Sequence, residues 1–333
     1  MTENLQKNIW NNIFCNGIKE NSFMKVYSIF DDFGDKAALL MENEGIEVTV
    51  HPLGIPRPTS EEMKKILEMY DGVIIGTSQK ITAEMFENIN ELRVIVTASV
   101  GVDHIEIPEE KKNFITVYNT PSANAQSVAE YTIGCAITCC KRLIEGKKLY
   151  LEEKNNKHLS QKPEDLNNKT LGVVGAGKVS EKIMEYAGFF QMKILCWTLH
   201  PDKHKELIEK GVSFVSLEEL MKQSDFISVN LPNVIGTKQL ISSKLIECMK
   251  KDAVFISVSR LDTIDIDSLI HKARENRNFY VCLDVDVDSK ISRKIQGMEN
   301  VLITPHIAGG TVETRKRMFF ESARRMVEYK KSH

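Results

Sequence analysis

The stretch Thr170–Phe190, TLGVVGAGKVSEKIMEYAGFF, carries the strongest fold signal in the chain. It begins as an apolar strand, turns at Gly175-x-Gly177 and continues with the apolar spacing of a helix. In the G-x-G-x-x-G pattern, the first glycine makes the tight turn and the second lets the backbone approach a pyrophosphate at the helix N-terminus. Ser180 stands where the third glycine would allow close helix–strand packing. In this strand–turn–helix context, the stretch predicts a nucleotide site.

The next strand, MKILCWT, lacks the acidic residue that is expected about 20 residues after the glycines to bind the ribose 2′-hydroxyl. Thr198 stands there instead, and two histidines and two lysines follow within residues 200–205. The missing carboxylate removes the repulsion that would exclude a 2′-phosphate, but no arginine offers a bidentate grip on one. Both NAD and NADP therefore stay open as the cofactor.

Short apolar runs alternate with helical patterns on both sides of this stretch, in one series before residue 120 and a second from residue 170 to residue 304. Such βαβα alternation predicts parallel sheets covered on both faces. One long helix is predicted over residues 122–153, followed by a polar surface connection over 154–169.

The bulk composition sets limits on function. A chain of 333 residues is long enough for two domains. Its net charge of −2 gives no indication of a nucleic-acid or anionic-membrane partner. Residues 1–22 have no secretory-signal pattern and are expected to form either a packed helix or a disordered lead. The longest near-apolar run, YTIGCAITCC, is too short to span a membrane, and the seven cysteines show neither disulfide nor zinc spacing, so we expect a cytoplasmic protein.

The stretch CLDVDVDSKIS, residues 282–292, places aspartates at 284, 286 and 288. A calcium loop would need glycine at its sixth position and glutamate at its twelfth, where Ser289 and Ile295 stand, so no metal site is expected. The remaining interpretations are the polar face of a strand and a catalytic carboxylate.

Seven motifs, in one order along almost the whole chain, are similar to those of the D-2-hydroxyacid dehydrogenase family. They are SVGVDHIEI (99–107), NTPSANAQSVAE (119–130), TLGVVGAGKVS (170–180), VNLPNVIGTKQLI (229–241), MKKDAVFISVSR (249–260), CLDV (282–285) and NVLITPHIAG (300–309).

The resemblance implies an α/β fold with two doubly wound parallel-sheet domains. A Rossmann dinucleotide-binding domain, residues 121–306, would be inserted into a flavodoxin-like substrate domain made of residues 1–120 and 307–333. Family members commonly form homodimers through the cofactor domain, so a homodimer is expected.

The implied activity is hydride transfer between NAD(P)H and a small 2-oxo acid or D-2-hydroxy acid. In this reaction a cation binds the carboxylate and ketone, and an acid protonates the developing alkoxide. The family's arginine and histidine match Arg260 and His306, and the backbone near Val100 and Gly101 would hold the substrate carboxylate. The loop GTSQKIT lacks an arginine that some members use on substrate, but it carries Lys80.

The resemblance also implies a set of cofactor contacts and one departure from the pattern. The expected cofactor residues are Gly175, Ala176, Gly177, Lys178, Val179, Thr198, Leu231, Pro232, Thr237, Val258, Ser259, Asp284 and Gly309. Family members carry a glutamate five residues after the aspartate of LDV, which favours the imidazolium form of the histidine.

In this chain that position is Ser289. We therefore expect Asp288 to contact His306 and Asp286 to face solvent. A second departure, Leu261 in place of the glycine after the arginine, predicts a crowded turn. These changes leave two alternatives open: a catalytically weakened member that acts as a nucleotide-binding or regulatory module, and a related reaction on an atypical substrate.

Overall fold

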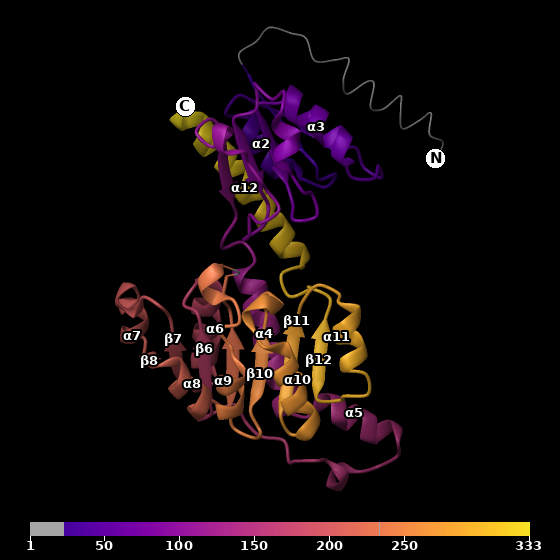
Figure 1. The fold of residues 1–333 in the computed structure, drawn as a ribbon, viewed down its shortest axis with the longest axis vertical. Coiled ribbons are helices and arrows are strands. Elements are labelled where there is room, and N and C mark those ends of the chain that lie inside the picture. Colours follow the sequence, from indigo (N-terminus) through magenta and orange to yellow (C-terminus); the bar gives the residue numbers. More distant parts are fainter. Residues whose placement is uncertain (1–22, 233) are drawn as a thin grey trace. The chain divides into compact units, whose positions relative to one another are not determined.

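The computed structural model describes residues 23–232 and 234–333, so the predictions for residues 1–22 lie outside the described part. The chain divides into two compact units. Unit 1 comprises the described residues up to Ala123 together with Arg315–His333, and unit 2 is Asn124–Thr314. Each unit is built on one all-parallel sheet with helices beside it, which confirms the predicted fold class (Figure 1).

Unit 1 contains a five-stranded sheet in the order β2-β1-β3-β4-β5. This is the flavodoxin-like order, in which the chain reverses its direction of winding between β1 and β3. Because every ladder is parallel, the carboxyl ends of all five strands lie at one edge. The strands are β1 (Met24–Ser28), β2 (Ile46–Val50), β3 (Gly72–Ile75), β4 (Val94–Thr97) and β5 (Thr116–Asn119).

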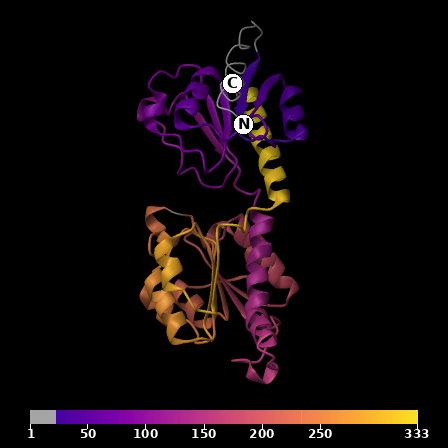
Figure 2. The same ribbon diagram turned by 90° about the vertical axis from the view of Figure 1, so that its right-hand side faces the viewer.

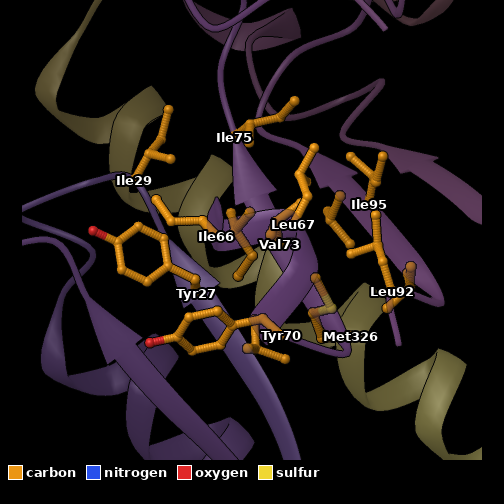
Figure 3. Packing of buried hydrophobic residues seen from close by; sticks show 14 of the residues in the cluster. Tyr27, Ile29, Ile66, Leu67, Tyr70, Val73, Ile75, Leu92, Ile95 and Met326 are labelled. Atoms are coloured by element: carbon orange, nitrogen blue, oxygen red, sulfur yellow. The ribbon is translucent and has the colours of Figure 1, made fainter. Parts of the chain in front are cut away.

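The described residues of this unit form the helices α2 (Asp35–Glu42), α3 (Ser60–Met69) and most of α12 (Val312–Ser332). Thr59 caps α3 in a reciprocal capping box with Glu62. Figure 3 shows Leu67 of α3 and Met326 of α12 packed in one cluster with Tyr27 of β1, and all three side chains are fully buried. The C-terminal helix is therefore part of the core of unit 1.

Unit 2 contains a seven-stranded parallel sheet in the order β12-β11-β10-β9-β6-β7-β8. This is the Rossmann order with a seventh strand added, and its switch point lies between β6 and β9. The strands are β6 (Thr170–Val174), β7 (Lys193–Trp197), β8 (Ser213–Phe214), β9 (Phe226–Val229), β10 (Val254–Ser257), β11 (Tyr280–Asp284) and β12 (Val301–Thr304).

Alternate side chains of these strands enter two separate cores, one on each face of the sheet. Figure 2 shows helices on both faces of this sheet. Val173 and Cys282 pack beneath α4 (Ala125–Cys140) and α6 (Lys178–Phe189). Their neighbours Val174 and Leu283 pack on the other face, which is covered by α8 (Leu217–Gln223), α9 (Ser243–Cys248) and α10 (Ile266–Glu275). The other helices of this unit are α5 (Leu143–Leu151), α7 (Lys205–Glu209) and α11 (Ser289–Lys294). This period-two burial explains why the strands are apolar throughout.

The prediction of a single helix over residues 122–153 is wrong in one respect, because this segment forms two helices. The first, α4, ends at Cys140, and α5 spans Leu143–Leu151. Between them Arg142 adopts a left-handed backbone conformation with φ of 54°. Its guanidinium is buried, lies 4.7 Å from the ring centre of Tyr280 and donates a hydrogen bond to Gln161. A tertiary contact thus breaks the helix where the local pattern continues.

The units divide at 123/124 and 314/315, whereas the sequence predicts boundaries at 120/121 and 306/307. The larger difference has a physical reason, because hydrogen bonds hold the segment after His306 to unit 2. Ser127 of α4 donates to the carbonyl of Ala308 at 2.6 Å, and Asp284 accepts from the Ala308 N–H at 2.8 Å.

In the part of the chain that the structure describes, no helix is long and apolar enough to cross a membrane. The described residues also hold no group of three His, Cys, Asp or Glu side chains placed to bind a metal ion.

Candidate active site

The residues predicted to bind the cofactor follow the carboxyl ends of the unit 2 strands, at the switch-point edge of the sheet. Gly175 has φ of +98°, and a Cβ at this position would lie 2.8 Å from the carbonyl oxygen of Asn230. Only glycine meets both conditions, so this turn after β6 requires the residue that the sequence supplies.

The N-terminus of α6 leaves space for a phosphate. A Cβ on Gly177, the N-cap of α6, would meet nothing within 4 Å, and helix N-termini favour anions. Lys178 opens the helix and pairs with Glu181 at 2.9 Å. Ser180 is fully buried, and its hydroxyl has no hydrogen-bond partner among the described residues. The helix therefore accommodates serine at the third glycine position, and the turn fits a nicotinamide dinucleotide.

The other predicted cofactor residues lie along the same edge. Thr198 follows β7 and is half-buried. Ser259 follows β10, donates to the carbonyl of Val229 at 3.0 Å and accepts from the Leu231 N–H at 2.7 Å. Thr237 similarly fixes the loop after β9 by donating to the carbonyl of Pro232 at 2.6 Å. The remaining members of the set at this edge are Ala176, Val179, Val258, Asp284 and Gly309.

One carboxylate connects the two residues that were predicted to act on substrate. Asp286 accepts from Nη1 of Arg260 at 2.9 Å and contacts Nδ1 of His306 at 2.8 Å. Since a carboxylate only accepts, Nδ1 of His306 carries the hydrogen and Nε2 is left for another partner. The side chain of Asp286 is 74% exposed, as expected. It also makes these two contacts, which the sequence did not indicate.

Asp288, which we expected beside His306, is used elsewhere. Its side chain is the N-cap of α11 and accepts from the N–H groups of Lys290 at 2.7 Å and Ile291 at 3.2 Å. These backbone donors, Ile291 foremost, hold the pKa of Asp288 below its usual range. An aspartate directly before a short helical pattern is an N-cap signal, and it could have assigned Asp288 and left Asp286 for His306.

Asp284 fixes the loop that carries His306. It is 4% exposed and accepts from the N–H groups of Ile307 and Ala308, both at 2.8 Å, and from the Thr304 hydroxyl at 2.6 Å. His306 itself has φ of +54°, an uncommon conformation for a residue with a side chain. The buried carboxylate therefore stabilises a strained turn that aims the imidazole toward Asp286.

Arg260 is also held by its backbone. It caps the short 3₁₀ turn Leu261–Thr263, and its carbonyl accepts from the Thr263 hydroxyl at 2.8 Å. Leu261 is not among the residues with positive φ, so the expected crowding at this position produces no backbone strain. The guanidinium stays 39% exposed and is accessible to an anion.

The pKa of Asp286 is held below its usual range, chiefly by the hydrogen bond from His306 and further by the charge of Arg260. Because the pKa in the folded state is lowered, Asp286 is ionised throughout the neutral range. As the pH falls through that lowered pKa, the carboxylate is protonated and its charge no longer pairs with Arg260.

The three residues predicted to contact substrate from unit 1 follow the carboxyl ends of β3 and β4. Lys80 is exposed in the loop after β3. Val100 and Gly101 follow β4, where their carbonyls accept from Asn119 and Ser99, both at 2.7 Å. Among the residues that the structure describes, none accepts a hydrogen bond from the N–H groups of Val100 and Gly101. Both amides are therefore available to an anion.

Comparison with known proteins gives a family match and full-length relatives. Residues 133–308 match the model of the D-isomer specific 2-hydroxyacid dehydrogenase, NAD binding domain. The chain is 32% identical over 293 residues to a hydroxypyruvate reductase of Thermotoga maritima, covering 86% of this chain and 92% of that protein. It is 30% identical over 295 residues to a glyoxylate reductase of Thermofilum pendens, covering 87% of each chain.

Two solved structures resemble the whole fold. One is an acyclic imino acid reductase in complex with NADPH and D-Arg, with a TM-score of 0.80 and 27% identity over 93% of this chain and 98% of that chain. The other is D-lactate dehydrogenase of Aquifex aeolicus with NAD and lactic acid, with a TM-score of 0.75 and 26% identity over 92% of this chain and 96% of that chain.

The role of Asp284 predicts the effect of Asp284→Asn. The amide presents an N–H₂ group toward backbone donors, so at least one buried N–H loses its acceptor. We expect a loss of about 1–3 kcal/mol in the free energy of unfolding, measured by urea denaturation. The matched control is Asp252→Asn at an exposed position, with an expected change within about 0.5 kcal/mol. Equal stability of the two variants would contradict the assigned role.

Proposed function

Because the chain belongs to the D-isomer specific 2-hydroxyacid dehydrogenase family, and is therefore an NAD(P)-dependent oxidoreductase of 2-oxo acids, we propose that Arg260 binds the substrate and His306 donates the proton. The observation that carries this proposal is the pairing of Arg260 and His306 with one carboxylate, that of Asp286, at 2.9 and 2.8 Å. Reduction of a ketone needs positive charge beside the substrate carboxylate and a proton for the developing alkoxide.

A bound nicotinamide would supply the hydride. The residues of this chain bind and orient the substrate and transfer the proton. The guanidinium of Arg260 pairs with the substrate carboxylate, for which its planar fork is suited. The N–H groups of Val100 and Gly101 are the donors that unit 1 would offer to a substrate carboxylate. As the carbonyl carbon accepts the hydride, Nε2–H of His306 gives its proton to the carbonyl oxygen. Asp286 holds Nδ1–H throughout and stabilises the imidazolium before the transfer.

The cofactor residues are proposed on the fit of the turn after β6. Gly175 and Gly177 would admit the pyrophosphate at the N-terminus of α6, and Thr198 would face the adenosine ribose. Thr198 carries no negative charge to repel a 2′-phosphate, so both NADH and NADPH belong in any test of activity.

The activity is tested by following NADH and NADPH absorbance with a panel of 2-oxo acids that includes glyoxylate, hydroxypyruvate and pyruvate. We expect turnover with at least one acid, and a decrease in kcat of roughly 10²–10⁴-fold in His306→Ala, since that is the usual contribution of a general acid. The control is His271→Ala, an exposed histidine on α10 of the same unit.

Two results would contradict the proposal. If His306→Ala retained the wild-type rate, His306 would not be the proton donor. If the cofactor bound without turnover of any acid, the alternative of a nucleotide-binding or regulatory module would replace the reductase.

We further propose that the protein acts in the cytoplasm as a homodimer. The described cysteines are all free thiols, which suits a reducing compartment. Leu143, Tyr150 and Leu151 of α5 expose 53%, 82% and 72% of their surface, an apolar stripe that a second copy would cover. Light scattering should give twice the chain mass of 37.8 kDa, and a mass of one chain would contradict the dimer.

A further inference from the structure

A cavity lies at the amino edge of the unit 2 sheet, opposite the edge that carries the turn at Gly175. It is lined by residues at the starts of β6, β9, β10 and β11 and by residues at and after the end of α4, all within unit 2. Its volume is about 30 Å³, which is room for about two water-sized groups, and it is partly open to solvent. None of the residues assigned to the cofactor or to the substrate lines it.

The guanidinium of Arg142 forms the buried wall of this cavity. Arg142 is 8% exposed, lies over the ring of Tyr280 and donates through Nη2 to the side-chain oxygen of Gln161. Burial raises the pKa of the Tyr280 hydroxyl, and a hydrogen bond with Arg142 acts in the opposite direction. Nε and Nη1 of Arg142 are buried as well, and neither has a hydrogen-bond partner among the described residues. Because unpaired buried donors are costly, a ligand with acceptor atoms would be stabilised here.

The positive charge of Arg142 is directed at the cavity, because the carboxylates around it have other partners. Three carboxylates of the surrounding segments are engaged elsewhere: Glu145 by Ser160, Glu164 by Lys169 and Asp225 by Lys250. In the described part of the chain, Arg142 forms no ion pair with any carboxylate. The two lysine pairs leave the rest of the wall close to neutral.

Asp252 gives the cavity a second charge of opposite sign. It stands just before β10, is exposed, and forms no ion pair within residues 23–232 and 234–333. One small space is thus lined by a buried cation and an exposed carboxylate. Asp252 would repel a simple anion and Arg142 would repel a simple cation, whereas a molecule that carries both charges satisfies both groups.

We propose that this cavity binds a small zwitterion of the α-amino acid class, with its carboxylate on the unpaired N–H groups of Arg142 and its ammonium group toward Asp252. An α-amino acid carries both charges on one carbon atom, so it is short enough for a cavity of this size. Glycine and alanine are the expected ligands, because a larger side chain would extend through the opening into solvent. This site shares no residue with the proposed reductase site, so the two proposals stand or fall separately.

The test is isothermal titration calorimetry of the full-length protein in amino-acid-free buffer, with glycine, acetate and methylammonium as probes. We expect glycine to bind and acetate to bind roughly threefold more weakly, since acetate lacks the ammonium group that pairs with an exposed carboxylate. Methylammonium should give no binding, because it has no acceptor for Arg142. An absence of glycine binding would overturn the inference, and so would acetate binding as tightly as glycine.

The variant Gln161→Glu tests Arg142 without removing its packing on Tyr280. It places a carboxylate where the side-chain oxygen of Gln161 accepts from Nη2, so the guanidinium acquires an internal partner. We expect the affinity for glycine to fall roughly 10–100-fold, the usual effect of losing a hydrogen bond to a charged group. The matched control is Gln296→Glu, which adds the same charge at an exposed position of unit 2 outside the cavity and should bind glycine like the wild type.

The variant Asp252→Asn tests the other end of the ligand and changes only an exposed side chain. Its affinities for glycine and acetate should become equal, because the ammonium group of glycine no longer meets a carboxylate. Unchanged glycine affinity in Gln161→Glu, or an unchanged preference for glycine over acetate in Asp252→Asn, would overturn the assignment of these groups.

Discussion

The hydrogen bonds to the buried carboxylate of Asp284 are the constraint on which the candidate active site depends. Two backbone N–H groups and the Thr304 hydroxyl converge on this side chain. A buried charge is costly unless such donors satisfy it, so the turn after β12 is not free to relax. His306 occupies the left-handed region because the residues directly after it are bound to Asp284. The direction of the imidazole is thus set from the core of unit 2.

The three aspartates of the stretch Asp284–Asp288 have three different surroundings. Asp284 ends β11 and is buried, Asp286 lies beyond the strand and meets Arg260 and His306, and Asp288 caps α11. Aspartates two residues apart would share one face if the strand continued. The strand ends at the first of them, and this separates their environments. The exposed pair of Arg260 and Asp286 contributes little to stability, so its value lies in organising charge for the reaction.

The sequence predicted the parts of this arrangement that depend on local chemistry. The turn at Gly175 and the alternation of strands and helices each follow from a few neighbouring residues. The family resemblance located Arg260 and His306. The sequence did not predict the break at Arg142 or the partner of His306, because each results from tertiary contacts. Arg142 packs on Tyr280, and His306 meets Asp286, which follows a different strand.

The kcat/KM of Asp286→Asn, compared with that of Asp288→Asn, tests whether Asp286 is the partner of His306. We predict that Asp286→Asn lowers kcat/KM by roughly 10²-fold or more, because Arg260 and His306 lose the carboxylate that both contact. Asp288→Asn should stay within about twofold of the wild type, since asparagine caps a helix as well as aspartate. If Asp288→Asn gave the larger loss, or if the kcat/KM of Asp286→Asn matched that of the wild type, Asp286 would not be the partner of His306 in catalysis.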